Sequence, residues 1–119
     1  MNSNSQTGIR GEELATKHIV SKHYTIIERN YRTPLGEIDI IAQKGMQIAF
    51  IEVKCRIGDT KGKPYEAITR TKLHHMRRAA TFYILQKKLK NYKLSLQVIS
   101  IQLKSDLTVE KLLWFEDLV

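Results

Sequence analysis

The chain has 119 residues, the length of about one domain, and its 20 Lys and Arg against 12 Asp and Glu give a net charge of +8. It contains no apolar run of the roughly 18 residues that a membrane-spanning helix needs, and its polar first residues lack the apolar core of a signal peptide. Its single cysteine excludes an internal disulfide. We therefore expect one cytoplasmic domain over residues 1–119, with no membrane contact and with a polyanion such as nucleic acid as its partner.

The first expected element is a helix over residues 8–23, after a disordered segment at 1–7. On a helical wheel Glu12 falls inside the apolar sector that also holds Ala15 and Ile19. A carboxylate among apolar side chains is costly unless it has a partner, so Glu12 is a candidate functional residue. The alternative is that Glu12 simply gains from the helix dipole near the helix N-terminus.

Three strands are expected next, over residues 24–30, 37–42 and 47–55, with a turn at Pro34 and Gly36 between the first two. The second and third are separated by a short loop that is typical of a hairpin. Isoleucine, phenylalanine and valine occupy both faces of these two strands, which indicates that they are buried on both sides.

Three charged residues interrupt this apolar hairpin: Asp39, Glu52 and Lys54. Because strand side chains alternate, Glu52 and Lys54 share one face, and a matching register would make Asp39 a cross-strand neighbour of Glu52. Lys54 would lie about 7 Å further along the strand. The alternatives are that Asp39 pairs with Lys54 at a strand end, or that Glu52 and Lys54 form a solvated stripe.

The three carboxylates Glu12, Asp39 and Glu52 can therefore converge. Two like charges about 4 Å apart repel by roughly 4 kcal/mol at an effective dielectric of 20, and a divalent cation would remove this cost. Oxygen ligands with open water positions suit Mg²⁺ or Mn²⁺. Such a metal could polarise a phosphoryl oxygen and activate a water, while Lys54 stabilises the charge that develops in the transition state.

A basic segment follows, with 12 Lys and Arg against two acidic residues between Lys54 and Lys93. Residues 56–63 are expected to form a loop, and residues 65–89 a helix that has Pro64 in its first turn and Ile68 on its apolar face. The basic side chains could be no more than a solvated helix face, but we expect some of them to contact phosphates. The candidates are Arg32, Arg56, Lys61, Lys63, Arg70, Lys72, Arg77 and Arg78.

Two further strands are expected at residues 94–103 and 111–115. Trp114 and Phe115 in the last strand are expected to close the core or to form a subunit contact, rather than to stack on bases. Cys55 is expected to pack as a small apolar residue and not to act as a nucleophile.

Several strings of residues, spread over nearly the whole chain, carry a resemblance to a known family. They are Gly11-Glu12 with Ala15, Arg29 to Arg32, Gly36 to Ala42, Phe50 to Lys54 with Arg56, Gly62, Glu66-Ala67, and Lys72 with Ala79 or Ala80. With these strings the chain resembles the YraN-like bacterial proteins. That family resembles the restriction-endonuclease-like superfamily and is similar in its core to archaeal Holliday-junction resolvases.

The resemblance implies an α/β fold with a mixed central β-sheet flanked by α-helices, a Mg²⁺ site formed by Glu12, Asp39 and Glu52, and Lys54 as the catalytic lysine. The implied function is a Mg²⁺-dependent DNA endonuclease, with branched or damaged DNA as the candidate substrate and a homodimer as the candidate assembly. The alternative is a nucleic-acid-binding protein that retains the nuclease fold without turnover, because a fold does not fix an activity. A third reading is a scaffold for a protein complex that uses the aromatic C-terminus.

The chain departs from the family pattern at two places. Ile38 stands where the superfamily has proline before the aspartate, a change that is common in the resolvase-like branch. Ser95-Leu96-Gln97 stands where the YraN-like pattern has Arg-Phe-Asp. The loss of those charges is expected to affect either substrate affinity or the packing of this strand.

Overall fold

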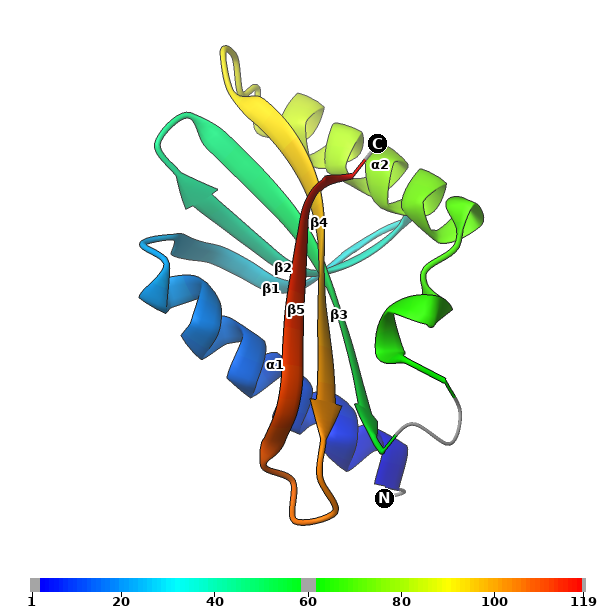
Figure 1. Ribbon diagram of the computed structural model, residues 1–119. Helices are drawn as coiled ribbons and strands as arrows, with labels where there is room; N and C mark the ends of the chain where they lie inside the picture. Colours follow the sequence, from blue (N-terminus) through cyan, green and yellow to red (C-terminus); the bar gives the residue numbers. More distant parts are fainter. Residues whose placement is uncertain (1–2, 59–61, 119) are drawn as a thin grey trace.

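A computed structural model describes residues 3–58 and 62–118 of the chain (Figure 1). Its elements are, in order, α1 (Ser3–Ser21), β1 (Thr25–Thr33), β2 (Gly36–Lys44), β3 (Gln47–Ile57), the 3₁₀ helix η1 (Pro64–Ala67), α2 (Arg70–Gln86), β4 (Lys93–Leu103) and β5 (Val109–Leu118). The strands form one sheet in the order β1-β2-β3-β4-β5, in which β3 and β4 run parallel and the other neighbours antiparallel. This is the predicted α/β architecture, a restriction-endonuclease-like core with a mixed sheet.

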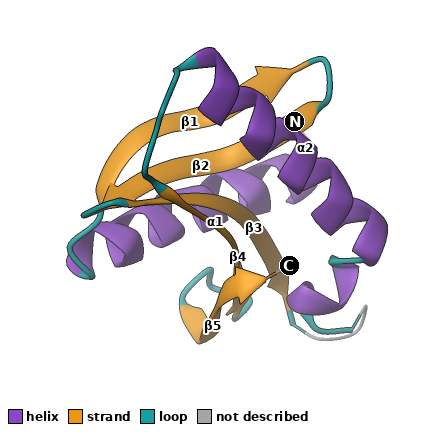
Figure 2. Cartoon of the chain, turned by 90° about the horizontal axis from the view of Figure 1, so that it is seen from above, coloured by secondary structure: helices purple, strands orange, loops and turns teal. Residues whose placement is uncertain are grey.

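The two helices cover opposite faces of the sheet, so that β1 and β2 lie between them in Figure 2. Ala15 and Ile19 of α1 pack on one face, and Met76 and Tyr83 of α2 pack on the other. Alternating residues of the hairpin supply each core. Ile40, Ala42, Ala49 and Ile51 lie under α1, whereas Ile41, Ile48 and Phe50 lie under α2. The prediction that both faces of β2 and β3 are buried is therefore confirmed.

Helix α1 begins at Ser3, five residues before the predicted start. Residues 3–7, which we expected to be disordered, are helical, because Thr7 is buried against the rest of the molecule and tertiary packing extends the helix toward its N-terminus. Glu12 consequently lies in the middle of α1 and not in its first turn. The helix dipole acts only within the first and last turns, so it does not explain a carboxylate at this position.

The prediction of a single helix over residues 65–89 is wrong in one respect, because this segment forms two separate helices. Pro64 does begin the first, η1, but the chain then becomes extended at Ile68 and Thr69 before α2 starts. The Thr69 hydroxyl accepts a hydrogen bond from the Lys72 N–H at 3.1 Å and so caps the N-terminus of α2. Ile68 therefore lies outside the helix on whose apolar face it was predicted.

The five strands match the predicted ones and extend beyond most of the predicted boundaries. Gly45, with a φ of +58°, makes the turn between β2 and β3, and the hairpin register pairs Ile40 with Ile51. None of the helices in the described part of the chain is long and apolar enough to cross a membrane.

The Ser95-Leu96-Gln97 segment is well packed within β4. Gln97 is fully buried; its Oε1 accepts a hydrogen bond from Trp114 Nε1 at 2.9 Å, and its Nε2 donates to Ser95 Oγ at 3.1 Å. Because these uncharged groups satisfy one another, the expected loss of packing does not occur.

Trp114 belongs to the core, as predicted. Phe115 does not, since it is 36% exposed and contacts Tyr65 on the surface.

Candidate active site

The candidate site lies where strands β2 and β3 separate. Their paired register ends at Ile40 and Ile51, so Asp39 and Glu52 would be the next pair. In place of a backbone partner, Asp39 Oδ2 accepts a hydrogen bond from the Val53 N–H at 2.8 Å. The carboxylate of Asp39 thus lies against β3 beside Glu52, at the position that strand alternation predicts.

Negative charge is crowded around Asp39. Burial raises the pKa of its carboxyl from the usual 3.8 to about 7, and the adjacent Glu52 carboxylate contributes to the increase. The Val53 hydrogen bond acts in the opposite direction, and Glu12 raises the pKa further. The Asp39 carboxyl therefore titrates near neutral pH. This indicates that the positive charges near the cluster do not balance its negative charges.

Glu12 approaches this cluster from helix α1. Its Oε1 is buried and has no hydrogen-bond partner in the described chain; the nearest cation is Arg29, whose NH2 atom lies 3.7 Å away. The backbone of α1 is held close to β3 at the preceding residue, because a Cβ built on Gly11 would lie 2.5 Å from Cys55 Cβ. The absence of a side chain at Gly11 therefore lets Glu12 reach the strand junction.

Glu52 is the most deeply buried of the three carboxylates, with a side chain that is 6% exposed. Its Oε2 lies 3.5 Å from Lys54 Nζ and 3.2 Å from Lys72 Nζ. Lys54 thus pairs with Glu52 and not with Asp39, and a solvated Glu52–Lys54 stripe is excluded by the burial of Glu52.

Lys72 was missed as a member of this site. We predicted it as a phosphate contact on a helix face, but the Thr69 cap starts α2 at Arg70 and so places Lys72 in its first turn, over Glu52. Spacing in the sequence could not reveal this, because Glu52 and Lys72 meet only when α2 packs on the sheet. The family strings in which Lys72 recurs were the available signal.

The donor set fits a hard divalent cation in its chemistry. The groups are carboxylate oxygens only, one buried oxygen of Glu12 has no hydrogen-bond partner among the described residues, and Asp39 titrates near neutral pH. As the side chains stand, no group of three or more His, Cys, Asp or Glu residues in segments 3–58 and 62–118 is arranged to hold an ion. Asp39 and Glu52 are therefore the pair that would hold Mg²⁺ or Mn²⁺, with Glu12 as the third candidate.

The predicted phosphate-contacting residues fall into three groups. Arg56, Lys63 and Lys72 lie on or next to the face of β3 that carries Glu52. Arg70, Arg77 and Arg78 are exposed on α2. Arg32 lies on strand β1, is 79% exposed and pairs with Glu37 at 3.4 Å, whereas Lys61 falls outside the described residues.

Cys55 has the predicted packing role. It contacts the core under α1 and the backbone of Gly11, and burial raises the pKa of its thiol to about 11. A thiol that stays protonated at neutral pH is a poor nucleophile, which agrees with a structural role.

Comparison with known proteins identifies the family. The family model described as "Uncharacterised protein family UPF0102" matches residues 11–101, which include the three carboxylates and both lysines of the site. The chain belongs to the UPF0102 family. A UPF0102 protein of Clostridium perfringens (strain SM101 / Type A) is 40% identical over 114 residues, covering 96% of this chain and 93% of the relative.

Two other UPF0102 proteins show similar agreement. That of Thermodesulfovibrio yellowstonii is 44% identical over 96 residues, covering 81% of this chain and 85% of its own. That of Desulfitobacterium hafniense is 50% identical over 86 residues, covering 72% of this chain and 69% of its own. The resemblance to YraN-like proteins that the sequence strings predicted is thus confirmed at the level of the family.

Proposed function

We propose that this UPF0102 protein is a divalent-metal-dependent DNA endonuclease of the cytoplasm that hydrolyses phosphodiester bonds, with branched or damaged DNA as its substrate. The observation that carries the proposal is the pair formed by the half-buried Asp39 and the buried Glu52, where two strands part, with the ammonium groups of Lys54 and Lys72 beside Glu52. A carboxyl group whose pKa is raised by burial and by a neighbouring carboxylate, as that of Asp39 is, is typical of catalytic sites.

Bound between Asp39 and Glu52, Mg²⁺ or Mn²⁺ would polarise a phosphoryl oxygen and lower the pKa of a water. Lys54, which is one-third exposed, can reach both Glu52 and a phosphate at the surface. Its ammonium group would stabilise the negative charge that grows on the phosphoryl oxygens. Lys72, whose Nζ lies 3.2 Å from the same Glu52 oxygen, offers a second such charge.

The second candidate function is DNA binding without turnover. Its support is the pairing of Glu52 with two lysines, which already compensates one of the carboxylates, together with the absence of a three-ligand arrangement among the described residues. In this reading Lys54 and Lys72 contribute only to phosphate binding.

A cleavage assay separates the two functions. End-labelled four-way junction, single-stranded and duplex DNA of related sequence would be incubated with the protein in Mg²⁺, in Mn²⁺ and in EDTA. We expect metal-dependent cleavage, and Lys54→Ala should lower the single-turnover rate by about 10²-fold or more with DNA affinity nearly unchanged. Lys87→Ala, at the C-terminal end of α2, is the matched control and should cleave like the wild type. If the wild-type protein cuts none of these DNAs with either metal, the enzymatic proposal is wrong.

A further inference from the structure

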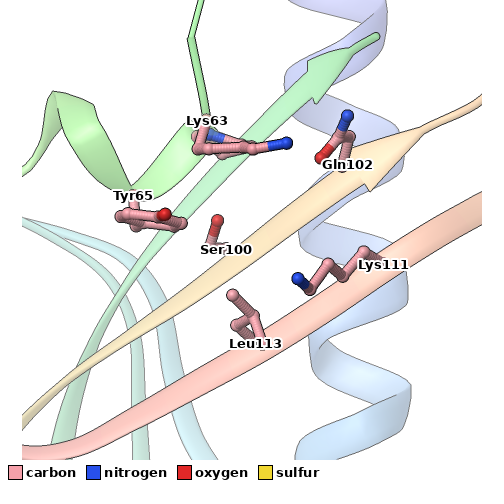
Figure 3. A pocket seen from close by; sticks show the side chains of 7 residues that line it. Lys63, Tyr65, Ser100, Gln102, Lys111 and Leu113 are labelled. Carbon is pink, nitrogen blue, oxygen red and sulfur yellow. The ribbon is translucent and has the colours of Figure 1, made fainter. Parts of the chain in front are cut away.

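A second polar site lies on the face of the sheet that carries Glu52 and Lys54. It is a pocket lined by residues at the start of η1 and on strands β4 and β5, namely Lys63, Pro64, Tyr65, Ser100, Gln102, Lys111 and Leu113. In Figure 3 Lys63 and Lys111 lie on the two sides of β4, the strand that carries Ser100 and Gln102. Among the described residues the lining carries two ammonium groups and no carboxylate, a composition that favours an anion.

Two polar side chains in this pocket belong to residues that are largely buried. Ser100 and Gln102 are 3% and 5% exposed, and neither side chain has a hydrogen-bond partner within the described residues. Gln97, on the opposite face of β4, is by contrast fully bonded. Glu12 Oε1 is the one fully buried side-chain oxygen or nitrogen atom without a hydrogen-bond partner among the described residues, so the polar atoms of Ser100 and Gln102 remain open to the pocket. Their hydroxyl and amide groups can therefore donate to a ligand that is rich in oxygen atoms.

The strand register places this pocket next to the catalytic lysine. Lys54 on β3 is the direct neighbour of Ser100 on β4, and Arg56 is the neighbour of Gln102. Adjacent strands are about 5 Å apart, and paired residues point to the same face. A phosphodiester at Lys54 would therefore have its neighbouring phosphate within reach of the pocket.

An exposed aromatic pair borders the pocket. Tyr65 of η1 and Phe115 of β5 meet edge to face, with ring centroids 5.7 Å apart, and are 38% and 36% exposed. Exposed aromatic rings next to basic groups are the usual platform for unpaired bases, because a base can stack on such a ring only when it leaves its own helix.

We propose that this pocket holds one unpaired nucleotide next to the bond that is cut. Lys63, Lys111, Ser100 and Gln102 bind its phosphate, and its base stacks on Tyr65 and Phe115. The inference rests on the proposed nuclease function, and it narrows the substrate to DNA with a single-stranded segment at the cleavage site.

Binding in EDTA tests the pocket without cleavage. The probe is a fluorescent 12-nucleotide oligothymidylate, compared with a blunt hairpin duplex of similar length by fluorescence anisotropy. The wild type should bind the single strand more tightly than the duplex. Tyr65→Ala and Lys111→Gln should each weaken single-strand binding at least fivefold, and Tyr65→Phe should retain it. Lys111→Gln should also reduce the slope of log affinity against log salt by about one.

Lys104→Gln, on the turn that follows β4, is the matched control for loss of a positive charge, and melting curves establish that each variant is folded. If Tyr65→Ala and Lys111→Gln bind the single strand as well as Lys104→Gln does, or if the wild type prefers the blunt duplex, the pocket proposal is wrong. These outcomes are distinct from failure of the proposed function, which is the absence of cleavage by the wild type. A wild type that cleaves normally and variants with unchanged affinity would overturn the pocket alone.

Discussion

Gly11 provides a sharp test of how helix α1 positions Glu12. A Cβ at this position would lie 2.5 Å from Cys55 Cβ and 3.1 Å from its sulfur, so Gly11→Ala forces α1 away from β3 by about 1 Å. Overpacking of this kind costs typically about 1–3 kcal/mol, against a helix-propensity gain of about 1 kcal/mol for alanine over glycine. Gly8→Ala in the same helix is the matched control, because no atom of another described residue beyond its neighbours lies within 4 Å of its added Cβ.

Urea titrations followed by far-UV circular dichroism measure both variants. We expect Gly8→Ala to be up to about 1 kcal/mol more stable than the wild type, and Gly11→Ala to be about 1–3 kcal/mol less stable than Gly8→Ala. Because a displacement of about 1 Å can cost 10²-fold in rate, Gly11→Ala should also reduce metal-dependent cleavage far more than Gly8→Ala does. Equal stability of the two variants would refute the close approach of α1 to β3, and equal cleavage would refute a role for Glu12.

Three further predictions concern individual side chains. Asp39→Asn keeps an acceptor for the Val53 N–H but removes the titrating carboxyl. The pKa of Asp39 is about 7 in the folded protein and near 3.8 when unfolded, so between pH 4 and 7 the folded state retains a proton that the unfolded state has released. As the pH rises from 4 to 7 in EDTA, the unfolding free energy of the wild type should therefore fall by up to about 4 kcal/mol, and that of Asp39→Asn should fall much less. An equal pH dependence of the two proteins in urea titrations would contradict this. Gln97→Met leaves Trp114 Nε1 without its acceptor and should lower the unfolding free energy by about 1–3 kcal/mol. A urea midpoint of Gln97→Met equal to that of the wild type would contradict this. Lys72→Ala should slow cleavage at least tenfold relative to Lys87→Ala in a single-turnover assay, and an unchanged rate would assign Lys72 to structure alone.

The sequence predicts most of the sheet and the core of the site because both follow from local patterns. Alternation along the hairpin determines that Ile40 and Ile51 face one helix and Ile41 and Phe50 the other. The same alternation brings Asp39 next to Glu52. Glu12 was identified from its place on the apolar side of a helix, even though the start of that helix was misplaced by five residues.

What escaped prediction depends on contacts between segments that are distant in the chain. The break before α2 at Thr69 is a local capping event, but its consequence, Lys72 over Glu52, requires α2 to be docked on the sheet. The aromatic pair Tyr65 and Phe115 joins residues 50 positions apart, on the short helix η1 and an edge strand. Neither of these two contacts produces a periodic pattern in the sequence.

The central claim is that Asp39 and Glu52 hold a catalytic divalent cation. Anomalous scattering from a crystal of the protein with Mn²⁺ and a non-cleavable DNA strand tests it most directly. We expect a manganese peak between the carboxylates of Asp39 and Glu52, with Glu12 as a direct or water-mediated ligand and with a phosphate oxygen near Lys54. Bound DNA with no manganese at these carboxylates, or with Glu52 still paired to Lys54 and Lys72, would contradict the claim and favour DNA binding without turnover.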